Sequence, residues 1–485
     1  MNAAAPAFLL RVEGINLDPL FSDTQHISVI RGASMALREA VADSHDWLRQ
    51  RHPGQVQAVS TGASVGLFRV EGGETAARDS RDFIAGQLNR HPLYRHLTFA
   101  VDVQPLADFG LDREKTLAKL RFRQLRQPSV AVPPPNSDPA VQPCPLDGLR
   151  PATEQAAIHA EPGLYSASVA QRYRHGRGRK KDFYERETRT PLPGHVAQLT
   201  WDLGEIADGP GYRQLNGKLA YVYVDGNQFG QVVDAAARQT GGGKLDLNRR
   251  WDAYIQDRRR QFLQAFIEDA AARPGFLTAD RRLRLEILLW GGDEFLLVVP
   301  AWLGFHALDR FYQAAADWSF PEPGGQRLSH AGGLVFCHHK TPVHRASQLA
   351  RQLAERVKEQ TGRQTDAFEY AVLESIDYPT EALDRFFRRL YLSLADTRQP
   401  LQPRQAMAAG KLPRLPKSQV YALARAALRG PAAFDAQFKR LGQVVDAALL
   451  RPALAELASL FGADSGPWPW VHLAQLWDYL APTPE

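Results

Sequence analysis

The sequence predicts an α+β protein with two ferredoxin-like βαββαβ units followed by a helical C-terminal domain. Three observations predict this fold class: the same order of short apolar strands and amphipathic helices occurs twice, a proline-rich segment separates the two occurrences, and only helical periodicity follows them. The chain has 485 residues, more than one hydrophobic core usually covers, so several domains are expected.

The first unit is expected within residues 1–125. Its apolar patterns predict a strand, a helix, two strands joined at Thr61-Gly62, a helix and a strand, at Phe8 to Gly14, Gly32 to Gln50, Val56 to Val70, Ala76 to Asn89 and Leu97 to Val103. This order folds most simply as an antiparallel sheet with both helices on one face.

A proline-rich and basic linker region, residues 126–216, is expected next. The stretch from Arg126 to Gly148 is too rich in proline for a helix or a central strand, so it marks the end of the first domain. Further on, Gln171 to Arg189 carries six basic residues within ten positions, together with two glycines. This segment predicts an anion-binding loop for RNA or nucleotide, and a solvated basic loop without a ligand explains it equally well.

The second unit is expected within residues 217–380, and residues 381–485 are expected to form the helical C-terminal domain. The predicted elements of the second unit are a strand (Leu219 to Asn227), a helix from near Phe229, a helix (Asn248 to Ala272), two strands joined at Gly291 to Glu294, a helix (Trp302 to Trp318), a strand (Leu328 to His339) and a helix (Pro342 to Gln360). The order of elements therefore looks duplicated, although the two units share little obvious sequence.

Composition narrows the class of protein. No apolar run is long enough to span a membrane, and the N-terminus lacks the pattern of a signal peptide, so a cytoplasmic protein without a membrane partner is expected. The two cysteines, Cys144 and Cys337, lie too far apart in sequence for a disulfide framework or a thiolate zinc site. A formal charge of +6 permits a nucleic-acid or nucleotide partner without requiring one.

Adjacent carboxylates lie at the tip of a predicted buried hairpin, in the stretch LLWGGDEFLLVVP from Leu288 to Pro300. The strand that ends at Asp225 is expected beside this hairpin, which brings Asp225 to the same edge as Asp293 and Glu294. Three carboxylates would repel one another, and a bound Mg²⁺ or Mn²⁺ with oxygen ligands resolves this repulsion. Such a site handles triphosphates, so the arrangement indicates nucleotidyl transfer, whereas GGDE alone is also compatible with a polar hairpin turn.

Glycines around these carboxylates predict space for a nucleotide. Gly291 and Gly292 leave room for a ligand against the turn. Gly226, Phe229 and Gly230 lie where a strand changes to a helix N-terminus, whose free N–H groups can receive phosphate oxygens.

Four ordered motifs carry a family resemblance: YVYVDGNQFG, LLWGGDEFLLVVP, LSHAGGLVFCHHKTPVHRASQLARQLAERVK and TDAFEYAVLES. Together they resemble the second palm domain of the large polymerase-cyclase subunit of type III CRISPR effector complexes, a family related to the GGDEF diguanylate cyclases. The first unit then resembles the degenerate first palm of that family, with VSTGASVGLF at its hairpin. CPLDGLRPA is similar to the cysteine-containing linker between the palms, with Asp147 where a second cysteine is usual, so no zinc site is expected there.

The resemblance implies conversion of ATP to a cyclic oligoadenylate second messenger in an antiviral system. It implies that Asp225, Asp293 and Glu294 are catalytic and hold the metals with the carbonyl of Gly226. The candidates for nucleotide contact are Gly226, Asn227, Phe229, Gly230, Gly291, Gly292 and Lys358. Asn227 stands where the family often has a second acidic residue, and the hairpin reads GGDE where the family usually has GGDD. His338, His339 and Lys340 are expected at a strand end facing this region.

The nuclease domain with an HD motif that many members carry is not expected, because the dipeptide His45-Asp46 lies within the first predicted helix. Two alternatives to the cyclase stay open: a nucleotide- or RNA-binding scaffold or sensor with little turnover, and a diguanylate cyclase acting on GTP. RNA, other CRISPR effector subunits and a second copy of the chain are the candidate macromolecular partners.

Overall fold

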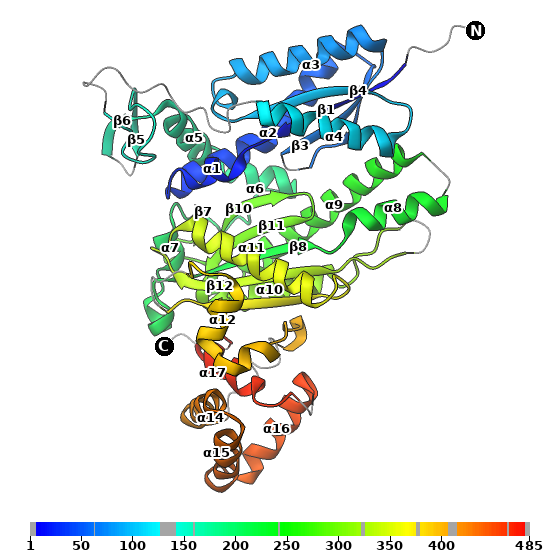
Figure 1. Ribbon diagram of the computed structural model, residues 1–485. Helices are drawn as coiled ribbons and strands as arrows, with labels where there is room; N and C mark the ends of the chain where they lie inside the picture. The colour runs from blue at the N-terminus through cyan, green and yellow to red at the C-terminus, as the bar shows by residue number, and fades with distance from the viewer. Residues whose placement is uncertain are drawn as a thin grey trace.

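The computed structural model describes residues 6–62, 64–126, 142–158, 161–240, 243–321, 325–374, 379–405, 415–462 and 465–480. Figure 1 shows two sheet-containing layers and, below them, a group of helices near the C-terminus. The predicted α+β class with a helical C-terminal region is confirmed. The domain boundaries at residues 125, 216 and 380 stay predictions.

The first sheet has the order β2-β3-β1-β4, and all three pairings are antiparallel. Its strands are β1 (Phe8–Gly14), β2 (Val56–Ser60), β3 (Val65–Val70) and β4 (Phe99–Pro105). Its helices and turns are α1 (Leu17–Ser22), α2 (Ile27–Arg51), α3 (Gly73–Arg90), η1 (Tyr94–His96) and α4 (Phe109–Arg126). Apolar side chains of α2 and α3 share one core with this sheet, as predicted, whereas α4 was not predicted and packs on β1 and β4.

The described part of the region between the two sheets is folded into helices, short strands and irregular segments. It contains β5 (Glu154–Ile158), β6 (Glu161–Tyr165), α5 (Ala167–Gly178), α6 (Lys180–Thr188), β7 (Gln198–Leu199), α7 (Leu203–Ala207) and η2 (Pro210–Leu215). Within the predicted linker region, residues 126–216, most of the proline-rich stretch from Arg126 to Gly148 (residues 127–141) lies outside the described residues.

The prediction that Gln171 to Arg189 forms a loop is wrong, because α5 and α6 cover this segment. Binding of an anion by its basic residues stays a prediction. Two of its cations are buried in the interior, where Arg172 pairs with Asp23 and Lys180 with Glu286. Helix α5 crosses α2 so closely that a Cβ on Gly176 would lie 2.0 Å from a backbone oxygen of α2. The glycine therefore permits helix packing and does not mark a loop.

The second sheet has the order β10-β11-β8-β12-β13, with β12 and β13 parallel and the other pairs antiparallel. The strands are β8 (Lys218–Gly226), β9 (Arg282–Leu283, outside this sheet), β10 (Glu286–Gly291), β11 (Glu294–Pro300), β12 (His330–His338) and β13 (Ala367–Val372). The helices are α8 (Phe229–Thr240), α9 (Lys244–Ala271), η3 (Pro274–Phe276), η4 (Ala301–Leu303), α10 (Gly304–Ala315) and α11 (Val343–Gln360).

The two faces of the second sheet belong to separate cores. Alternate residues of β8 such as Val222 and Val224 pack with α9 and α10, and their neighbours Tyr221 and Tyr223 pack with α11. This alternation is the period of two that a strand imposes on its side chains. Because Asp225 continues the series of Tyr221 and Tyr223, the strand places it on the α11 side.

The C-terminal region contains α12 (Leu383–Tyr391), η5 (Leu392–Thr397), α14 (Lys417–Arg429), α15 (Pro431–Val444), α16 (Ala447–Phe461) and α17 (Trp468–Leu480). Helix α17 returns to the second sheet, where Tyr370 of β13 contacts His472 at 2.8 Å through its hydroxyl. Among the described residues, no helix combines the length and the apolar character that crossing a membrane requires.

A buried ionic network connects the first unit to the second sheet. Arg31 of α2 donates through Nε to Glu286 of β10 at 2.6 Å, and Lys180 of α6 donates to the same carboxylate at 2.8 Å. Burial alone would raise the pKa of Glu286, but the charges of Arg31 and Lys180 lower it. The pKa of Lys180 falls to about 8, chiefly because of its burial. Three elements from different parts of the chain therefore meet at one ionised carboxylate.

Candidate active site

The predicted carboxylates gather at one edge of the second sheet. Strand β8 lies between β11 and β12, and Asp225 is the direct cross-strand partner of Glu294. The N–H of Gly226 donates to the carbonyl oxygen of Asp293 at 3.1 Å, which fixes the turn of the β10-β11 hairpin beside the end of β8. The predicted juxtaposition of Asp225, Asp293 and Glu294 therefore has a direct structural counterpart.

Lys358 is the cationic partner of this edge. Its ammonium group donates to a carboxylate oxygen of Asp225 and, at 3.0 Å, to Glu355 one turn earlier on α11. Burial lowers the pKa of Lys358, yet the hydrogen bond and charge of Asp225 outweigh burial and raise it. Lys358 is only 4% exposed, so its charge acts on Asp225 with little screening by water.

Tyr223 lies two residues before Asp225 on the same face of β8 and joins the cluster. Its hydroxyl donates to Glu294 at 2.6 Å and is 3.4 Å from a carboxylate oxygen of Asp225. Burial, followed by the charges of Glu294 and Asp225, raises the pKa of Tyr223. The phenol therefore stays protonated at neutral pH and acts as a donor that orients Glu294.

Asp293 differs from its two neighbours because no side chain of the described residues donates a hydrogen bond to it. It lies at the solvent-accessible tip of the hairpin. Desolvation by the surrounding groups and repulsion from Asp225 and Glu294 raise its pKa to about 6. A cation that reached this tip would relieve the repulsion and favour the ionised carboxylate.

The carboxylates at this edge are suited to a divalent cation that is also held by nucleotide phosphates. They are less suited to a cation held by protein ligands alone. Among the described residues, no group of three or more histidine, cysteine or acidic side chains is arranged to hold a metal ion. Tyr223 donates to one oxygen of Glu294 and Lys358 to one oxygen of Asp225, whereas Asp293 has no side-chain donor among the described residues. Asp293 and the second oxygen of Asp225 are therefore the groups nearest to that role. Mg²⁺ is commonly held by one or two carboxylates together with substrate phosphates, and this pair meets that requirement.

The turn that carries Asp293 is supported from behind by α9. Arg259 donates to the carbonyl oxygen of Gly292 at 2.8 Å, and its guanidinium lies 5.2 Å from the centroid of the Trp290 ring. The indole of Trp290 donates in turn to Glu187 of α6 at 2.9 Å. Gly292 has φ +53°, a conformation that glycine adopts without strain.

The hairpin of the first sheet meets this turn. A Cβ on Gly62 would lie 3.8 Å from the Cα of Gly292, so the tips of the two hairpins are neighbours. Asp252 of α9 holds the first tip by accepting from the hydroxyl of Ser60 at 3.0 Å and from the N–H of Thr61 at 3.2 Å. The two sheets therefore present corresponding hairpins to the same space.

The predicted nucleotide contacts occupy different environments. Phe229 is buried against Trp251 and His330, and its ring fills the space that a Cβ on Gly226 would need. Asn227 is buried and donates to Ser329 and to the carbonyl of Thr365, while Gly291 is buried in β10. Around Gly230, by contrast, a Cβ would meet no atom within 4 Å, and the N-terminal turn of α8 is open there.

The expectation that His338, His339 and Lys340 face the carboxylates is wrong. Strand β12 is antiparallel to β8, so His338 pairs with Lys218 at the start of β8, whereas His330 pairs with Gly226 at its end. The histidine pair therefore lies at the opposite edge of the sheet. Its local role is structural, since His339 contacts the carbonyl oxygen of Gly217 at 2.9 Å.

Asp147, at the position of a family cysteine, organises its own turn. It accepts hydrogen bonds from the N–H groups of Leu149 and Arg150 and from the hydroxyl of Ser166. Burial would raise the pKa of Asp147, but these hydrogen bonds lower it. Together with the guanidinium of Arg150, which also donates to Asp147, these groups bind an ionised carboxylate that stabilises the segment.

Three residues of the site were missed from the sequence: Tyr223, Arg259 and Asp252. The period of two along β8 could have found Tyr223, because it shares a face with Asp225. The other two come from α9, and their contacts with the hairpin tips depend on how that helix packs on the sheet. No local pattern carries that information.

A β-sheet of this order, with carboxylates at the adjoining ends of β8 and β11, defines a palm domain of the class found in nucleotide polymerases and cyclases. Residues 218–367 match the family model described as Cas10/Cmr2, second palm domain. The resemblance to the polymerase-cyclase subunit of type III CRISPR effector complexes is thereby confirmed. A search of curated proteins found no match.

Solved structures of Csm1 share the fold of the whole chain. A Csm1-Csm4 cassette in complex with cA4 aligns with 99% of this chain and 70% of its own at 12% identity, with a TM-score of 0.54. A cassette in complex with one ATP gives the same coverage and identity with a TM-score of 0.52. Csm1 in T.onnurineus aligns with 98% of this chain and 69% of its own at 14% identity, with a TM-score of 0.51.

Proposed function

We propose that this protein is a metal-dependent nucleotidyl cyclase that makes a cyclic oligoadenylate second messenger from ATP. The observation that carries the proposal is the convergence of Asp225, Asp293 and Glu294 at one sheet edge, with Lys358 behind them. A cluster of like charges costs stability, and perturbed carboxylates gathered at one place are typical of a site that binds a ligand.

The chain's residues divide the work between holding and orienting. Asp225 and Asp293 would hold a Mg²⁺ or Mn²⁺ ion, while Lys358 and Tyr223 keep Asp225 and Glu294 in fixed orientations. When bound, the ion neutralises phosphate charge and lowers the pKa of an attacking hydroxyl. The open turn at Gly230 offers the free N–H groups of the α8 N-terminus to phosphate oxygens.

The choice of ATP and of a cyclic product is supported by the relatives. Csm1-Csm4 cassettes of the same fold are solved in complex with one ATP and with cA4. By the same likeness, we propose that the chain acts beside partner subunits of a CRISPR effector complex and responds to RNA. Catalysis then requires two nucleotides. The 3′-hydroxyl of one meets the α-phosphate of the other near the two facing hairpin tips.

A binding role with little turnover is the second candidate. It is favoured by one observation: Lys358 and Tyr223 already engage Asp225 and Glu294, so only Asp293 lacks a side-chain partner among the described residues. The GGDE sequence also suggests a diguanylate cyclase. That enzyme would convert GTP, which distinguishes it from both candidates.

Mass spectrometry of the reaction products tests the proposal. The full chain, alone and with its co-purified subunits and RNA, is incubated with ATP, GTP or both in the presence of Mg²⁺ or Mn²⁺. The variants are Asp293→Ala/Glu294→Ala and, as a matched acidic control, Glu359→Gln on the exposed side of α11. A cyclic adenylate from the wild type and the control, but not from the double variant, supports the cyclase.

Other outcomes reject it in distinct ways. A cyclic adenylate that persists in the double variant contradicts the assignment of the carboxylates. A guanylate product identifies a diguanylate cyclase. Binding of ATP without any product, in every assembly tested, supports the scaffold.

A further inference from the structure

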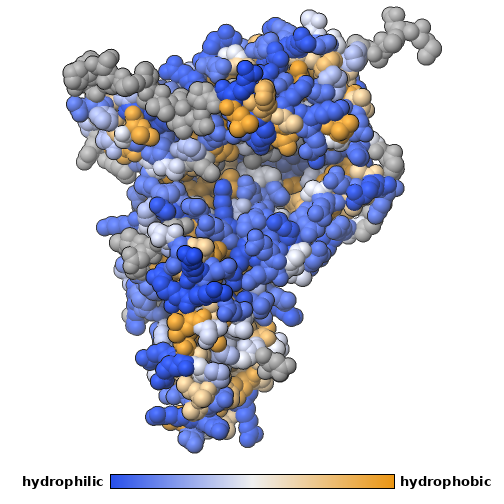
Figure 2. Space-filling model, in the orientation of Figure 1, coloured by the Kyte–Doolittle hydropathy of each residue, from blue (hydrophilic) through white to orange (hydrophobic). Residues whose placement is uncertain are grey.

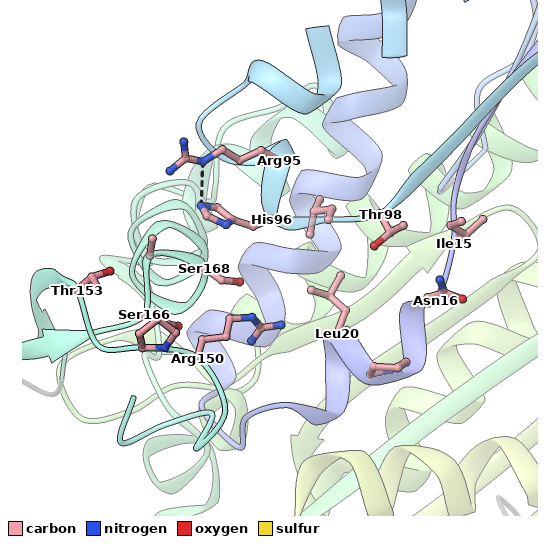
Figure 3. A pocket seen from close by; sticks show the side chains of 14 residues that line it. Ile15, Asn16, Leu20, Arg95, His96, Thr98, Arg150, Thr153, Ser166 and Ser168 are labelled. Atoms are coloured by element: carbon pink, nitrogen blue, oxygen red, sulfur yellow. Dashed lines mark hydrogen bonds between the residues drawn. The ribbon is translucent and has the colours of Figure 1, made fainter. Parts of the chain in front are cut away.

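A pocket of about 300 Å³ lies where the first unit meets the region before α5. Figure 3 shows that its walls come from the turn after β1, the segment between η1 and β4, the loop at Arg150 and the first turn of α5. This volume is at the lower end for pockets that hold small ligands. No residue of the palm carboxylate cluster lines this pocket.

The N-terminus of α5 opens into this pocket. Ser166 caps the helix by accepting from the N–H of Val169, and Ser166, Ala167 and Ser168 all line the cavity. The N–H groups of Ala167 and Ser168 have no acceptor among the described residues. Free N–H groups at the start of a helix of this length form a natural binding site for an anion.

The side chain of Ser168 provides independent evidence for a ligand. Ser168 is only 3% exposed, yet its hydroxyl has no hydrogen-bond partner among the described residues. In Figure 3 this hydroxyl and the guanidinium of Arg150 point toward the same space. The amide nitrogen of Asn16, on the opposite wall, is likewise buried without a partner. A buried polar group without a partner lowers stability, so a ligand with acceptor atoms would stabilise both groups.

The charge of the lining favours an anion. Arg95 and Arg150 line the pocket, and no acidic side chain does. Arg150 uses Nη1 for Asp23 and Asp147, whereas Arg95 has no carboxylate partner within the described part of the chain. His96 between them has its pKa lowered to about 4, by burial first and then by the nearby arginines, which is consistent with a positive potential.

We propose that this pocket binds a phosphate group, either free phosphate or the phosphate of a small ester no larger than a nucleoside monophosphate. The N–H groups of Ala167 and Ser168 and the Ser168 hydroxyl receive the phosphate oxygens. Arg95 supplies positive charge, and Arg150, whose Nη1 is paired with Asp23 and Asp147, offers further N–H donors. The organic part of an ester lies against the apolar walls formed by Ile15, Leu20 and Leu97.

Calorimetric titration of the full chain tests this site. Inorganic phosphate, AMP and adenosine are the three probes, and the Asp293→Ala background separates this site from the palm. Removing the cation with Arg95→Gln is expected to weaken phosphate binding about 10-fold, and Ser168→Ala about 5-fold. Ser80→Ala, another buried helical serine but bonded to a carbonyl in α3, is the matched control and should bind as the wild type does.

Thermal melting separates loss of binding from loss of folding. Ser168→Ala removes an unpartnered hydroxyl, so its melting temperature without ligand should equal or exceed that of the wild type. Phosphate should then raise the melting temperature of the wild type and of Ser80→Ala, but hardly that of Ser168→Ala.

The probes also identify the source of the phosphate. Tighter binding of AMP than of phosphate assigns an ester, and equal affinity assigns phosphate alone. Adenosine binding as tightly as AMP, absence of binding by phosphate and AMP at millimolar concentration, or equal affinity in all variants would overturn the proposal.

Discussion

The ends of the two central strands, β1 and β8, show how one backbone arrangement serves two purposes. Both strands end in an acidic residue followed by glycine, Glu13-Gly14 and Asp225-Gly226, and each lies between a hairpin and a returning strand. On the side of the hairpin, the cross-strand partner of Glu13 is Val65, whereas that of Asp225 is Glu294. The two sheets therefore share a topology and differ in the chemistry at this edge.

The partners of the two carboxylates explain the difference. Arg11 and Arg121 donate to Glu13 at 2.9 and 2.7 Å, so its charge is neutralised within the first unit. At the end of β8, Lys358 is set against three carboxylates, Asp225, Asp293 and Glu294, which leaves the edge with excess negative charge. The proposed cation site is therefore assigned to the end of β8, where carboxylates outnumber cations, and not to the end of β1.

The largest expected effect comes from breaking the edge of the second sheet. Asp225→Asn removes a proposed metal ligand and leaves Lys358 buried without its strongest partner. Product formation from ATP should fall by at least about 100-fold, as for the loss of a group that acts in the transition state. Steady-state kinetics measure this fall, and a variant with unchanged turnover would place the chemistry elsewhere.

Glu286→Gln should produce the next largest effect, on stability. The amide cannot neutralise Arg31 and Lys180, and both are buried with it. Breaking a buried ionic network in this way costs about 3–5 kcal/mol in the free energy of unfolding. Urea denaturation measures this loss. The control is Asp79→Asn, which breaks the exposed pair of Arg51 and Asp79 and should lower the free energy of unfolding by under about 1 kcal/mol. A similar loss of unfolding free energy in the two variants would contradict the view that Glu286 connects the first unit to the second sheet.

Arg259→Met tests the support of the GGDE turn. The change keeps apolar contact with Trp290 but removes the hydrogen bond to the carbonyl of Gly292. Because catalytic groups need accurate placement, turnover should fall about 10-fold with little change in the Michaelis constant for ATP. Arg258→Met, one position earlier on the same helix, should leave turnover near that of the wild type, and an equal loss in both variants would point to a general effect of α9.

Tyr223→Phe should have a smaller effect on the same edge. It removes the hydroxyl that orients Glu294 while keeping the ring under α11. One lost hydrogen bond to a charged group is worth about 1.5–3 kcal/mol at most, and water can replace part of it at this edge. Turnover should therefore fall by less than it does in Arg259→Met, and a variant as inactive as Asp225→Asn would give the phenol a direct role.

Glu13→Gln should have the smallest effect and completes the comparison. It is the counterpart of Asp225→Asn in the first sheet, but one of its partners, Arg121, is half exposed. The free energy of unfolding should fall by about 1 kcal/mol, and cyclase activity should not change. A loss of activity comparable with that of Asp225→Asn would show that both sheets carry the chemistry.

Local patterns were sufficient for the parts of the site that lie on one strand or one turn. Asp293 and Glu294 sit in a turn whose glycines and flanking apolar runs are visible in the sequence, and Asp225 ends a strand of unmistakable composition. Lys358 was found through the family resemblance, since an isolated lysine on a helix carries no signal of its own. The structure places its ammonium group on Asp225.

Features that depend on long-range packing were not predictable in the same way. The basic segment looked like a loop because charge density and glycines dominate its composition, but the partners of Arg172 and Lys180 lie 149 and 106 residues away. The error over His338 and His339 came from strand direction, because an antiparallel strand carries its C-terminal residues away from the end of β8. Arg259 depends on how α9 packs behind the turn.

Counting bound Mn²⁺ in the presence of a non-hydrolysable ATP analogue tests the central claim most directly. Electron paramagnetic resonance of the wild type, Asp225→Asn and Glu13→Gln compares the two strand ends in one experiment. The arrangement of carboxylates predicts that Mn²⁺ binds the wild type and Glu13→Gln equally and is lost from Asp225→Asn. Undiminished Mn²⁺ binding by Asp225→Asn, or equal losses in the two variants, would contradict the assignment of the cation site to the end of β8.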